Sequence, residues 1–356
     1  MVQFRRFLIA LLSAAALFQG AAVDAAVDAA YVPLTSVLIG NPGNVADPLT
    51  GRGAVTYPYY ITSTEVTNAH YAAFLNVVDP NGVNPHDLYN PNMTNATGFA
   101  VVKGGINFDP TASPGTMYNP KPNYGDKPVN YVSFHDAARY ANWVMTGNTE
   151  SGFYTFADTN TLVSQGVHGP GQHNGMNWVA LSSHDEWYKA AFHKNDGPTA
   201  NYYLYPTSSD AVPTIATATP SGDIANSGEN VANYNFGANW DGTGTLGHVT
   251  TVGSAGSESA SPYGTFDQGG NVMEWIDEST SSNRVMRGGS LWLGAETLRP
   301  TYSSFFNPLV GGSSLGFRLT GLGPITVVPV PAAAWLFGSS LVGLIGLVRR
   351  HKTLAF

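Results

Sequence analysis

The 356-residue sequence contains no cysteine. Disulfide bonds, thiolate nucleophiles and thiolate metal ligands are therefore excluded along the whole chain. Cationic side chains are also scarce, since 16 lysines and arginines stand against 24 acidic residues and give a formal net charge of -8. Because binding to a phosphate backbone needs clustered lysine and arginine, this composition argues against nucleic acid as a partner.

Glycine, proline and aromatic residues are abundant by contrast. The chain has 40 glycines and 23 prolines, and 12% of its residues are Phe, Trp or Tyr. This composition predicts a loop-rich fold that is held by aromatic packing rather than by long regular elements. No repeat of fixed period and no low-complexity linker divides the middle of the sequence. We therefore expect residues 31–325 to form a single domain.

The first 26 residues have the layout of a secretory signal peptide. Arg5 and Arg6 precede an apolar run over residues 7–18, and small residues follow over residues 22–30, where cleavage is expected. A membrane anchor is the alternative interpretation, and the short apolar run disfavours it.

The C-terminal end of the chain carries a second sorting segment, over residues 328–352. An apolar stretch over residues 332–348 is just long enough to enter a bilayer, and the basic residues after it favour a transmembrane helix with its C-terminal end in the cytoplasm. A proline-containing motif precedes this stretch. The motif and the two arginines that follow the apolar stretch are Val328, Pro329, Val330, Pro331, Ala332, Arg349 and Arg350.

This arrangement of motif, apolar helix and basic cluster resembles the PEP-CTERM family of sorting signals in its VPxPA variant. The resemblance implies export in a Gram-negative bacterium and processing by an exosortase-like membrane protease. The protein would be anchored transiently in the inner membrane, and would then lie at the cell surface or in an extracellular exopolysaccharide matrix.

Three short helices are predicted in the middle of the chain. Apolar residues recur at helical spacing in three segments, and the candidate caps of the helix starts are Thr67 or Asn68 for the first, Ser133 for the second and Ser183 for the third. Asp136 and Glu186 stand three residues after the two serines, which predicts capping boxes. Brief strands are expected at residues 57–62, 129–132, 178–181, 284–286 and 316–320. Long irregular segments remain at residues 79–126 and 200–230, and such loops usually carry a function or a stabilising ion.

Two segments offer hard oxygen ligands beside glycines. The stretch FDQGGNVMEWIDES contains Asp267, Asn271 and Glu274, and the stretch NYNFGANWDGTG contains Asn233 and Asp241. Calcium needs several oxygens in a flexible geometry, and glycines allow main-chain carbonyls to contribute. The same residue types also form ordinary turns, so composition alone leaves both explanations open.

Other catalytic and metal-binding patterns find little support. The histidines at 168, 173, 184, 193 and 248 lack the i, i+4 spacing of a helical metal pair, which favours surface or hydrogen-bonded roles. No G-x-S-x-G nucleophile elbow is present, because Ser290 follows a Gly-Gly pair instead.

The order of six motifs identifies a wider resemblance. The chain reads YYITSTEVTNAHYAAF, KPVNYVSFHDAARYANW, WVALSSHDEWYKAAFH, YGTFDQGGNVMEW, RVMRGGSLW and GFRLT. Over residues 55–320 this looks like the formylglycine-generating enzyme, or sulfatase-modifying factor, family. The resemblance implies a single complex α+β domain of the C-type-lectin-like kind, low in regular structure and stiffened by calcium.

The resemblance also implies two sets of calcium ligands. The second family site would use the side chains of Asp267 and Glu274 and the carbonyls of Gly270 and Val272. Asp267 stands where the enzyme commonly has asparagine, which is also a hard oxygen ligand. The first site would use Asn233 and Asp241 with the carbonyls of Tyr234 and Thr243, although the loop length differs there.

The departure from the family lies in catalysis. Active members use two cysteines that bind copper, and their positions are matched here by Leu293 and Leu298, with Gly294 in place of a histidine. Leucine neither ionises nor ligates a metal, so copper and formylglycine formation are not expected, although Ser290 is retained.

Three functions are consistent with this pattern. The favoured one is an exported, non-catalytic, calcium-stabilised protein that binds a peptide or glycan. One alternative is an oxidoreductase of the wider sulfatase-modifying factor and non-haem iron family, acting with a metal that the sequence does not reveal. The other is a structural matrix protein.

The loss of both cysteine positions leads to a prediction about metal content. Because no thiolate copper site can form and the histidines lack the spacing of a helical metal pair, we expect the purified protein to contain no stoichiometric copper or iron. Elemental analysis by mass spectrometry measures this directly. Copper or iron at one equivalent per chain would contradict the non-catalytic interpretation.

Overall fold

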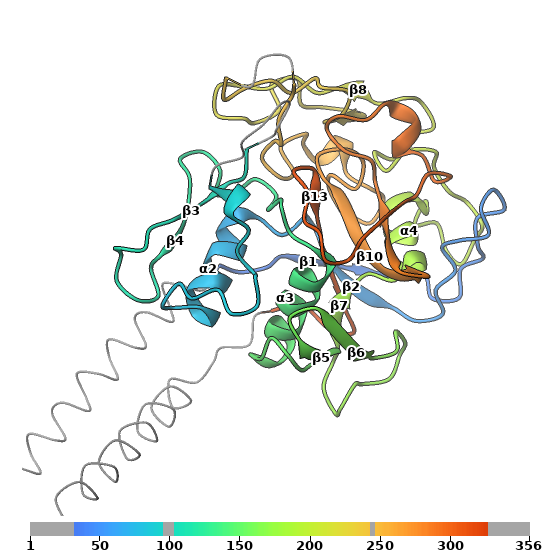
Figure 1. The fold of residues 1–356 in the computed structure, drawn as a ribbon. Coiled ribbons are helices and arrows are strands. Elements are labelled where there is room, and N and C mark those ends of the chain that lie inside the picture. The colour runs from blue at the N-terminus through green and yellow to red at the C-terminus, as the bar shows by residue number, and fades with distance from the viewer. Residues whose placement is uncertain (1–31, 95–102, 243–245, 327–356) are drawn as a thin grey trace, which may run out of the picture. The chain divides into compact units, whose positions relative to one another are not determined.

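The computed structural model describes residues 32–94, 103–242 and 246–326 (Figure 1). Val32–Val327 form one compact unit. The expected signal peptide, the proline motif and the C-terminal apolar helix all lie outside the described residues. Within the described ranges, no helix is both long and apolar enough to cross a membrane.

Two four-stranded sheets form the framework of the domain. The first sheet has the order β1-β2-β14-β7 and is antiparallel throughout; its strands are β1 (Ser36–Ile39), β2 (Tyr59–Thr62), β14 (Leu319–Gly321) and β7 (Val179–Leu181). The second has the order β12-β11-β10-β13; its strands are β12 (Ser304–Phe306), β11 (Asn283–Arg287), β10 (Met273–Thr280) and β13 (Leu315–Gly316). In the first sheet Thr320 pairs with Ile61, so the two ends of the folded unit meet in neighbouring strands.

Three helices pack around these sheets, and all three were predicted. They are α2 (Asn68–Val78), α3 (Phe134–Thr146) and α4 (His184–Phe192). The side chains of Thr67, Ser133 and Ser183 cap these helices by accepting hydrogen bonds from the main chain three residues later, so of the two candidates for α2 the cap is Thr67 and not Asn68. In Figure 1, α2 and α4 lie on opposite sides of the central strands.

Short elements occupy the connections. Three two-stranded ribbons are formed by β3 (Ile106–Phe108) with β4 (Tyr118–Pro120), by β5 (Tyr154–Asp158) with β6 (Thr161–Gln165), and by β8 (Thr214–Ile215) with β9 (Val231–Ala232). Single 3-10 turns are η1 (Pro91–Met93), η2 (Ser257–Ser259) and η3 (Ala295–Leu298). The long segments that the sequence predicted to be irregular therefore carry only brief structure where they are described.

Several strand predictions were wrong in detail. The expected strand over 129–132 is absent, because Tyr131 has a left-handed φ of 61° that interrupts extended backbone. The expected strand over 316–320 divides into β13 and β14, which belong to different sheets. Strands β1, β10 and β12 and the strands of the three two-stranded ribbons were not predicted. The glycines and acidic residues before Met273 favoured a loop, which concealed the eight-residue strand that follows.

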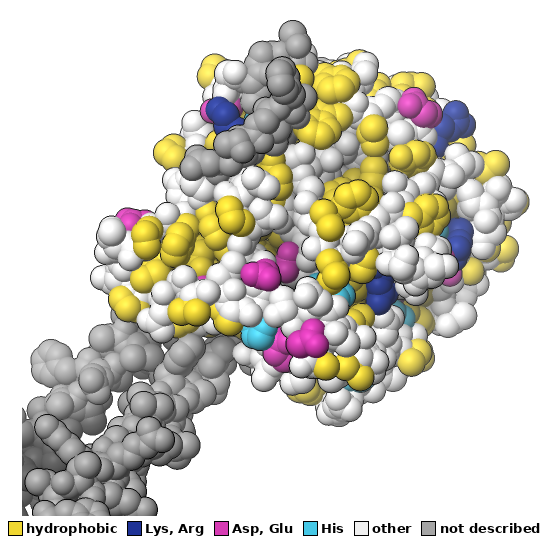
Figure 2. Space-filling view, in the orientation of Figure 1, with side chains coloured by type: hydrophobic (Ala, Val, Ile, Leu, Met, Phe, Trp, Pro, Cys, Tyr) yellow, Lys and Arg dark blue, Asp and Glu magenta, His cyan; other side chains and the backbone are white. Residues whose placement is uncertain are grey.

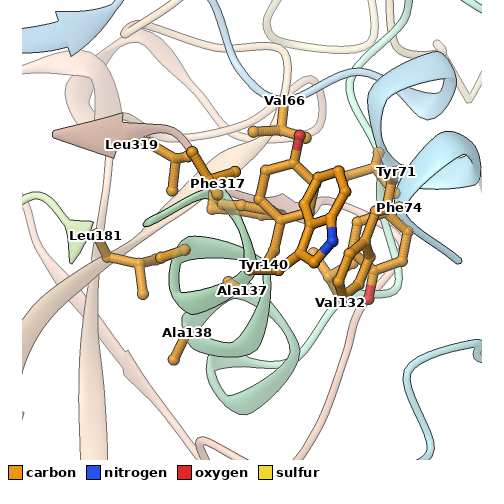
Figure 3. Close-up of a cluster of buried hydrophobic side chains, with 14 of the residues drawn as sticks. Val66, Tyr71, Phe74, Val132, Ala137, Ala138, Tyr140, Leu181, Phe317 and Leu319 are labelled. Carbon is orange, nitrogen blue, oxygen red and sulfur yellow. The ribbon is translucent and has the colours of Figure 1, made fainter. Parts of the chain in front are cut away.

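Aromatic packing fills the core between α2, α3 and the first sheet, as the composition predicted (Figure 3). The ring of Tyr140 lies 5.9 Å from that of Tyr71, 5.1 Å from that of Phe74 and 5.4 Å from that of Phe317, measured between centroids. All four side chains are buried. Rings at these separations stabilise each other beyond the area that they bury.

The C-terminal end of α3 gives a test of this local structure. Gly147 ends the helix with a φ of 76°, where a Cβ is unfavourable. We expect Gly147→Ala to lower the free energy of unfolding by about 1 kcal/mol, measured by urea denaturation. Gly125→Ala is the matched control, since a Cβ at Gly125 would meet nothing within 4 Å and its φ is not left-handed. Equal effects of the two substitutions would contradict this account.

Candidate functional site

The Gly-Gly-Ser loop begins where β11 ends. Gly288 and Gly289 both have left-handed φ values, 95° and 68°, and a Cβ on Gly289 would overlap Thr297. Ser290 is buried at the base of the loop. The glycines are therefore required by the backbone path, whether or not the loop has a catalytic role.

Both leucines that the sequence analysis predicted at the family cysteine positions take part in apolar packing. Leu298 is fully buried in a cluster with Tyr205, Ala232 and Tyr234. Leu293 is partly buried and packs against the main core. These positions therefore carry no group that can ionise, accept an electron or ligate a metal.

The Gly-Gly-Ser loop is joined by main-chain hydrogen bonds to both predicted calcium segments. Leu291 donates to the carbonyl of Asn271 at 3.0 Å and accepts from Phe236 at 2.7 Å. Asn271 in turn donates to the carbonyl of Asn233 at 2.7 Å. Gly270 has a φ of 93°, and a Cβ there would overlap the Asn233 carbonyl. The three segments, far apart in sequence, thus form one contiguous layer.

At the first predicted calcium site, one buried oxygen has no partner. The amide nitrogen of Asn233 donates to the His248 carbonyl at 2.8 Å, which fixes the orientation of the amide and leaves Oδ1 buried and unpaired. The carbonyl of Tyr234 accepts from Gly237 at 3.2 Å. Thr243, the fourth predicted ligand, lies outside the described residues.

A protein cation already lies beside Asp241, the remaining ligand of that site. Nζ of Lys103 lies 2.9 Å from Oδ2 of Asp241 and 3.0 Å from its carbonyl oxygen, and Tyr124 donates to Oδ2 at 2.5 Å. Burial opposes ionisation of Asp241, but the bonds from Tyr124 and Lys103 lower its pKa overall. The first site is therefore a poorer fit for calcium, because an ammonium group competes for the same oxygens.

The second predicted calcium site is built around Glu274, the second residue of β10. Its carboxylate accepts from Nε and Nη2 of Arg318 at 2.7 and 2.8 Å, and from the indole of Trp187 at 2.7 Å. All three side chains are buried. Asp267 accepts from the main chain of Gly253 at 2.6 Å, and burial raises the pKa of Asp267 to about 6.

Glu65 adds a third carboxyl group at this site, and the sequence analysis missed it. Its side chain is 1% exposed, and neither carboxylate oxygen has a hydrogen-bond partner. Burial, followed by the charge of Asp267, raises the pKa of Glu65 well above its usual value. The sequence contained one signal for a role of Glu65, namely that an ionisable residue lies between the end of β2 and the cap of α2. Three carboxyl groups therefore surround one guanidinium.

This imbalance of charge fits a bound cation, with one geometric condition. Among the described residues, no three acidic or histidine side chains converge closely enough to hold a metal by themselves. A cation near Asp267 and Glu274 would therefore also need main-chain oxygens, such as the carbonyls predicted at Gly270 and Val272. At the second site both oxygens of Glu274 already accept hydrogen bonds from Arg318, and one also accepts from Trp187, so Asp267 is the predicted side-chain ligand without a protein cation on it.

A separate buried network surrounds His168. Its Nδ1 lies 2.9 Å from Oε2 of Glu186, and its Nε2 lies 3.1 Å from Oδ2 of Asp277. Arg284 pairs with the other oxygen of Asp277 at 2.8 Å, and Tyr57 donates to Glu186 at 2.8 Å. Burial disfavours the charged imidazole, but the two carboxylates outweigh it and raise the pKa of His168 to about 10.

An open groove lies elsewhere on the domain and was not predicted. Two cavities of about 300 and 560 Å³ share His135, Asn160 and Leu309, so they form one continuous depression. None of the predicted calcium ligands, and neither Leu293 nor Leu298, lines it. Figure 2 shows acidic and histidine side chains gathered near the centre and lower part of one face of the domain.

Comparison with known families decides the classification. Residues 33–321 match the model of the sulfatase-modifying factor enzyme 1-like domain. The chain belongs to this family. The match confirms the resemblance over residues 55–320, and the fold is the single, mixed domain with small helices and short sheets that the resemblance implied. A search of curated proteins found no match.

Solved structures resemble the whole described domain. The crystal structure of CarF is 20% identical, with a TM-score of 0.49, and the alignment covers 82% of this chain and 99% of CarF. Variable protein 1 of Treponema denticola is 18% identical, with a TM-score of 0.45 and coverage of 82% and 96%. PvdO from Pseudomonas aeruginosa is 16% identical, with a TM-score of 0.40 and coverage of 82% and 92%.

The His168 network predicts a pH-dependent stability. The folded-state pKa of about 10 lies above the unfolded value of about 6.5, so the stabilisation is complete below pH ~6.5 and is lost as pH rises toward 10. We expect His168→Gln to cost about 3 kcal/mol at neutral pH, because it leaves the buried carboxylate of Glu186 without a cation and Asp277 with Arg284 alone. Urea denaturation at several pH values measures both effects. Parallel pH curves for the native protein and the variant would contradict this role.

Proposed function

We propose that this protein is a non-catalytic, calcium-stabilised member of the family, exported from the cell, that binds a peptide or glycan ligand. The observation that carries the proposal is the burial of Leu298, with Leu293 packed nearby against the core. At both family cysteine positions, a redox-active ligand is replaced by a hydrocarbon side chain that contributes to packing.

The argument against the family reaction is chemical. Copper-dependent oxygen activation by this family needs two thiolates, and the sequence has no cysteine. Ser290 keeps its place in the loop, but a hydroxyl group alone supplies neither an electron nor a soft metal ligand. Retention of the loop is explained by its main-chain hydrogen bonds to residues 236 and 271, which hold the domain together.

The argument for calcium rests on charge. Glu65, Asp267 and Glu274 share one buried counter-ion, Arg318, so their full ionisation would leave an excess of negative charge in the interior. A divalent cation held by Asp267 and Glu274 offsets this excess, and its role would be to fix the loop that precedes β10. We assign calcium to the second family site, because Asp267 makes no ion pair among the described residues and lies beside the two further carboxyl groups of Glu65 and Glu274, whereas Lys103 lies on Asp241 at the first site.

Export is supported by the sequence of the two ends. The N-terminal run over residues 7–18 and the C-terminal segment over residues 328–352 are both of the sorting type. After processing by an exosortase-like protease, the domain would act at the cell surface or in the exopolysaccharide matrix. A net charge of -8 and the absence of cysteine are compatible with such a location.

Removal of calcium tests the proposal directly. We expect chelation to lower the melting temperature by about 5 °C or more, because a ligand that binds only the folded state contributes a few kcal/mol of stability. Asp267→Ala should abolish calcium binding in calorimetry, whereas Asp267→Asn should retain it, since an amide oxygen is also a hard ligand.

Asp210→Ala is the matched control for this experiment. Asp210 is 55% exposed, makes a loose ion pair with Lys194 at 3.4 Å and accepts from the main chain of Leu204 at 2.9 Å, and it is none of the predicted ligands, so its loss should leave calcium binding unchanged. If the native protein binds no calcium and chelator does not change its melting temperature, the calcium assignment is wrong. The non-catalytic interpretation would remain, because it depends on Leu293 and Leu298.

A further inference from the structure

Neutral polar side chains form much of the wall of the larger cavity in the groove that includes His135. The hairpin between β10 and β11 contributes Ser279, Ser281, Ser282 and Asn283 to the larger cavity, and Asn160 belongs to both cavities. Within the described ranges, no protein group hydrogen-bonds to the side chains of residues 281–283 or of Asn160. Hydroxyl and amide groups both donate and accept hydrogen bonds, so this wall is suited to a ligand that does the same.

The larger cavity of the groove offers little free charge at neutral pH, whereas Asp87 and Asp136 line the smaller one. Arg284 is the one cation in the wall of the larger cavity, and Asp277 pairs with it at 2.8 Å. Burial lowers the pKa of His135 to about 4, so its imidazole is neutral. A strongly acidic or basic ligand would therefore find no unpaired counter-charge in the larger cavity.

An apolar rim borders the same cavity. Leu309 lines both cavities and is 45% exposed. Phe306 is 39% exposed, pairs with Arg284 across β11 and β12, and precedes Asn307, which lines the larger cavity. Because side chains of directly paired residues lie on the same face of a sheet, Phe306 and Arg284 share the groove side.

This combination of surfaces favours one ligand class. A sugar ring has an apolar C–H face that packs on an aromatic ring, and hydroxyl groups around its edge that bond to amides and hydroxyls. An extended peptide would instead be recognised through a free sheet edge with apolar pockets for alternate side chains. The cavity volumes lie within the range of about 300–1,000 Å³ that is typical of small-molecule sites.

We propose that this groove binds a neutral oligosaccharide, with one sugar ring packed on Phe306 and neighbouring hydroxyl groups bound by Asn160 and residues 281–283. The inference rests on the proposed binding role and adds the site and the class of ligand. It does not depend on the calcium site or on the Gly-Gly-Ser loop, which lie outside the groove.

The test uses the purified full chain and a panel of neutral oligosaccharides of glucose, galactose and N-acetylglucosamine, with a random peptide library in parallel. Calorimetry on the best oligosaccharide then compares two neighbouring variants. We expect Phe306→Ala to weaken binding roughly tenfold or more, which corresponds to the loss of one aromatic contact.

Phe305→Ala is the matched control. Phe305 is the adjacent residue of β12, is 50% exposed, and points to the opposite face of the strand, so its loss should leave the affinity unchanged. A second pair protects the test against misfolding. Asn160→Ala, at an exposed position in the groove, should weaken binding severalfold, whereas Leu49→Asp, a 56% exposed position outside the groove, should not. Thermal unfolding verifies that each variant is folded.

Each outcome separates this inference from the broader proposal. Oligosaccharide binding that is lost in Phe306→Ala and Asn160→Ala, and retained in the controls, supports the site. If Phe306→Ala and Asn160→Ala both bind the oligosaccharide with unchanged affinity, the site is wrong but a glycan-binding role remains. Binding of peptides alone overturns the ligand class and leaves the binding role. No binding of either class overturns both.

Discussion

The buried pairing of Arg318 with Glu274 is the interaction on which the rest of the domain depends. Arg318 precedes β14 of the first sheet, and Glu274 belongs to β10 of the second, so the pair connects the two sheets. The guanidinium also donates to the carbonyls of Thr62 and Phe266, at 3.1 and 2.7 Å. Burying such a pair carries a desolvation cost. Removing one partner leaves the other charge buried and unpaired, which lowers the free energy of unfolding by roughly 3–5 kcal/mol. The pair therefore fixes the relative position of the sheets more than it adds to net stability.

In the connections between strands and helices, hydrogen bonds between loops take the place of regular secondary structure. The Gly-Gly-Ser loop, the loop before β10 and the loop after Val231 are held to one another by main-chain hydrogen bonds at Asn233, Asn271 and Leu291. The loop can therefore keep the form of a catalytic segment while the groups that perform the reaction are gone. Leu298 shows how the change is accommodated, because a buried leucine contributes apolar contacts where a cysteine pair would need access to metal and oxygen. Scaffold and chemistry are separable in this fold, and the groove beside β12 lies away from both.

The sequence predicted the features that depend on neighbouring residues better than the features that depend on residues far apart along the chain. The three helices were predicted with their caps, because a serine or threonine and the residue three positions later act within one turn. Strands were predicted less well. Whether residues 316–320 form one strand or two depends on partners more than 40 residues away in β10 and more than 250 away in β2. Tyr131 adopts a left-handed conformation for which a tyrosine gives no local signal.

The sequence by itself determined that no thiolate chemistry is available and that the order of motifs is that of the family, and it predicted Leu293 and Leu298 at the cysteine positions. These conclusions need only residue identity and order along the chain. The tertiary structure alone decided that Glu65 lies buried and unpaired beside Asp267, that Lys103 lies on Asp241, and that residues from β6, β10, β11 and the 307–311 segment form one groove. Burial, the balance of charge and the shape of a cavity arise from segments that are distant in sequence, and packing alone brings those segments together.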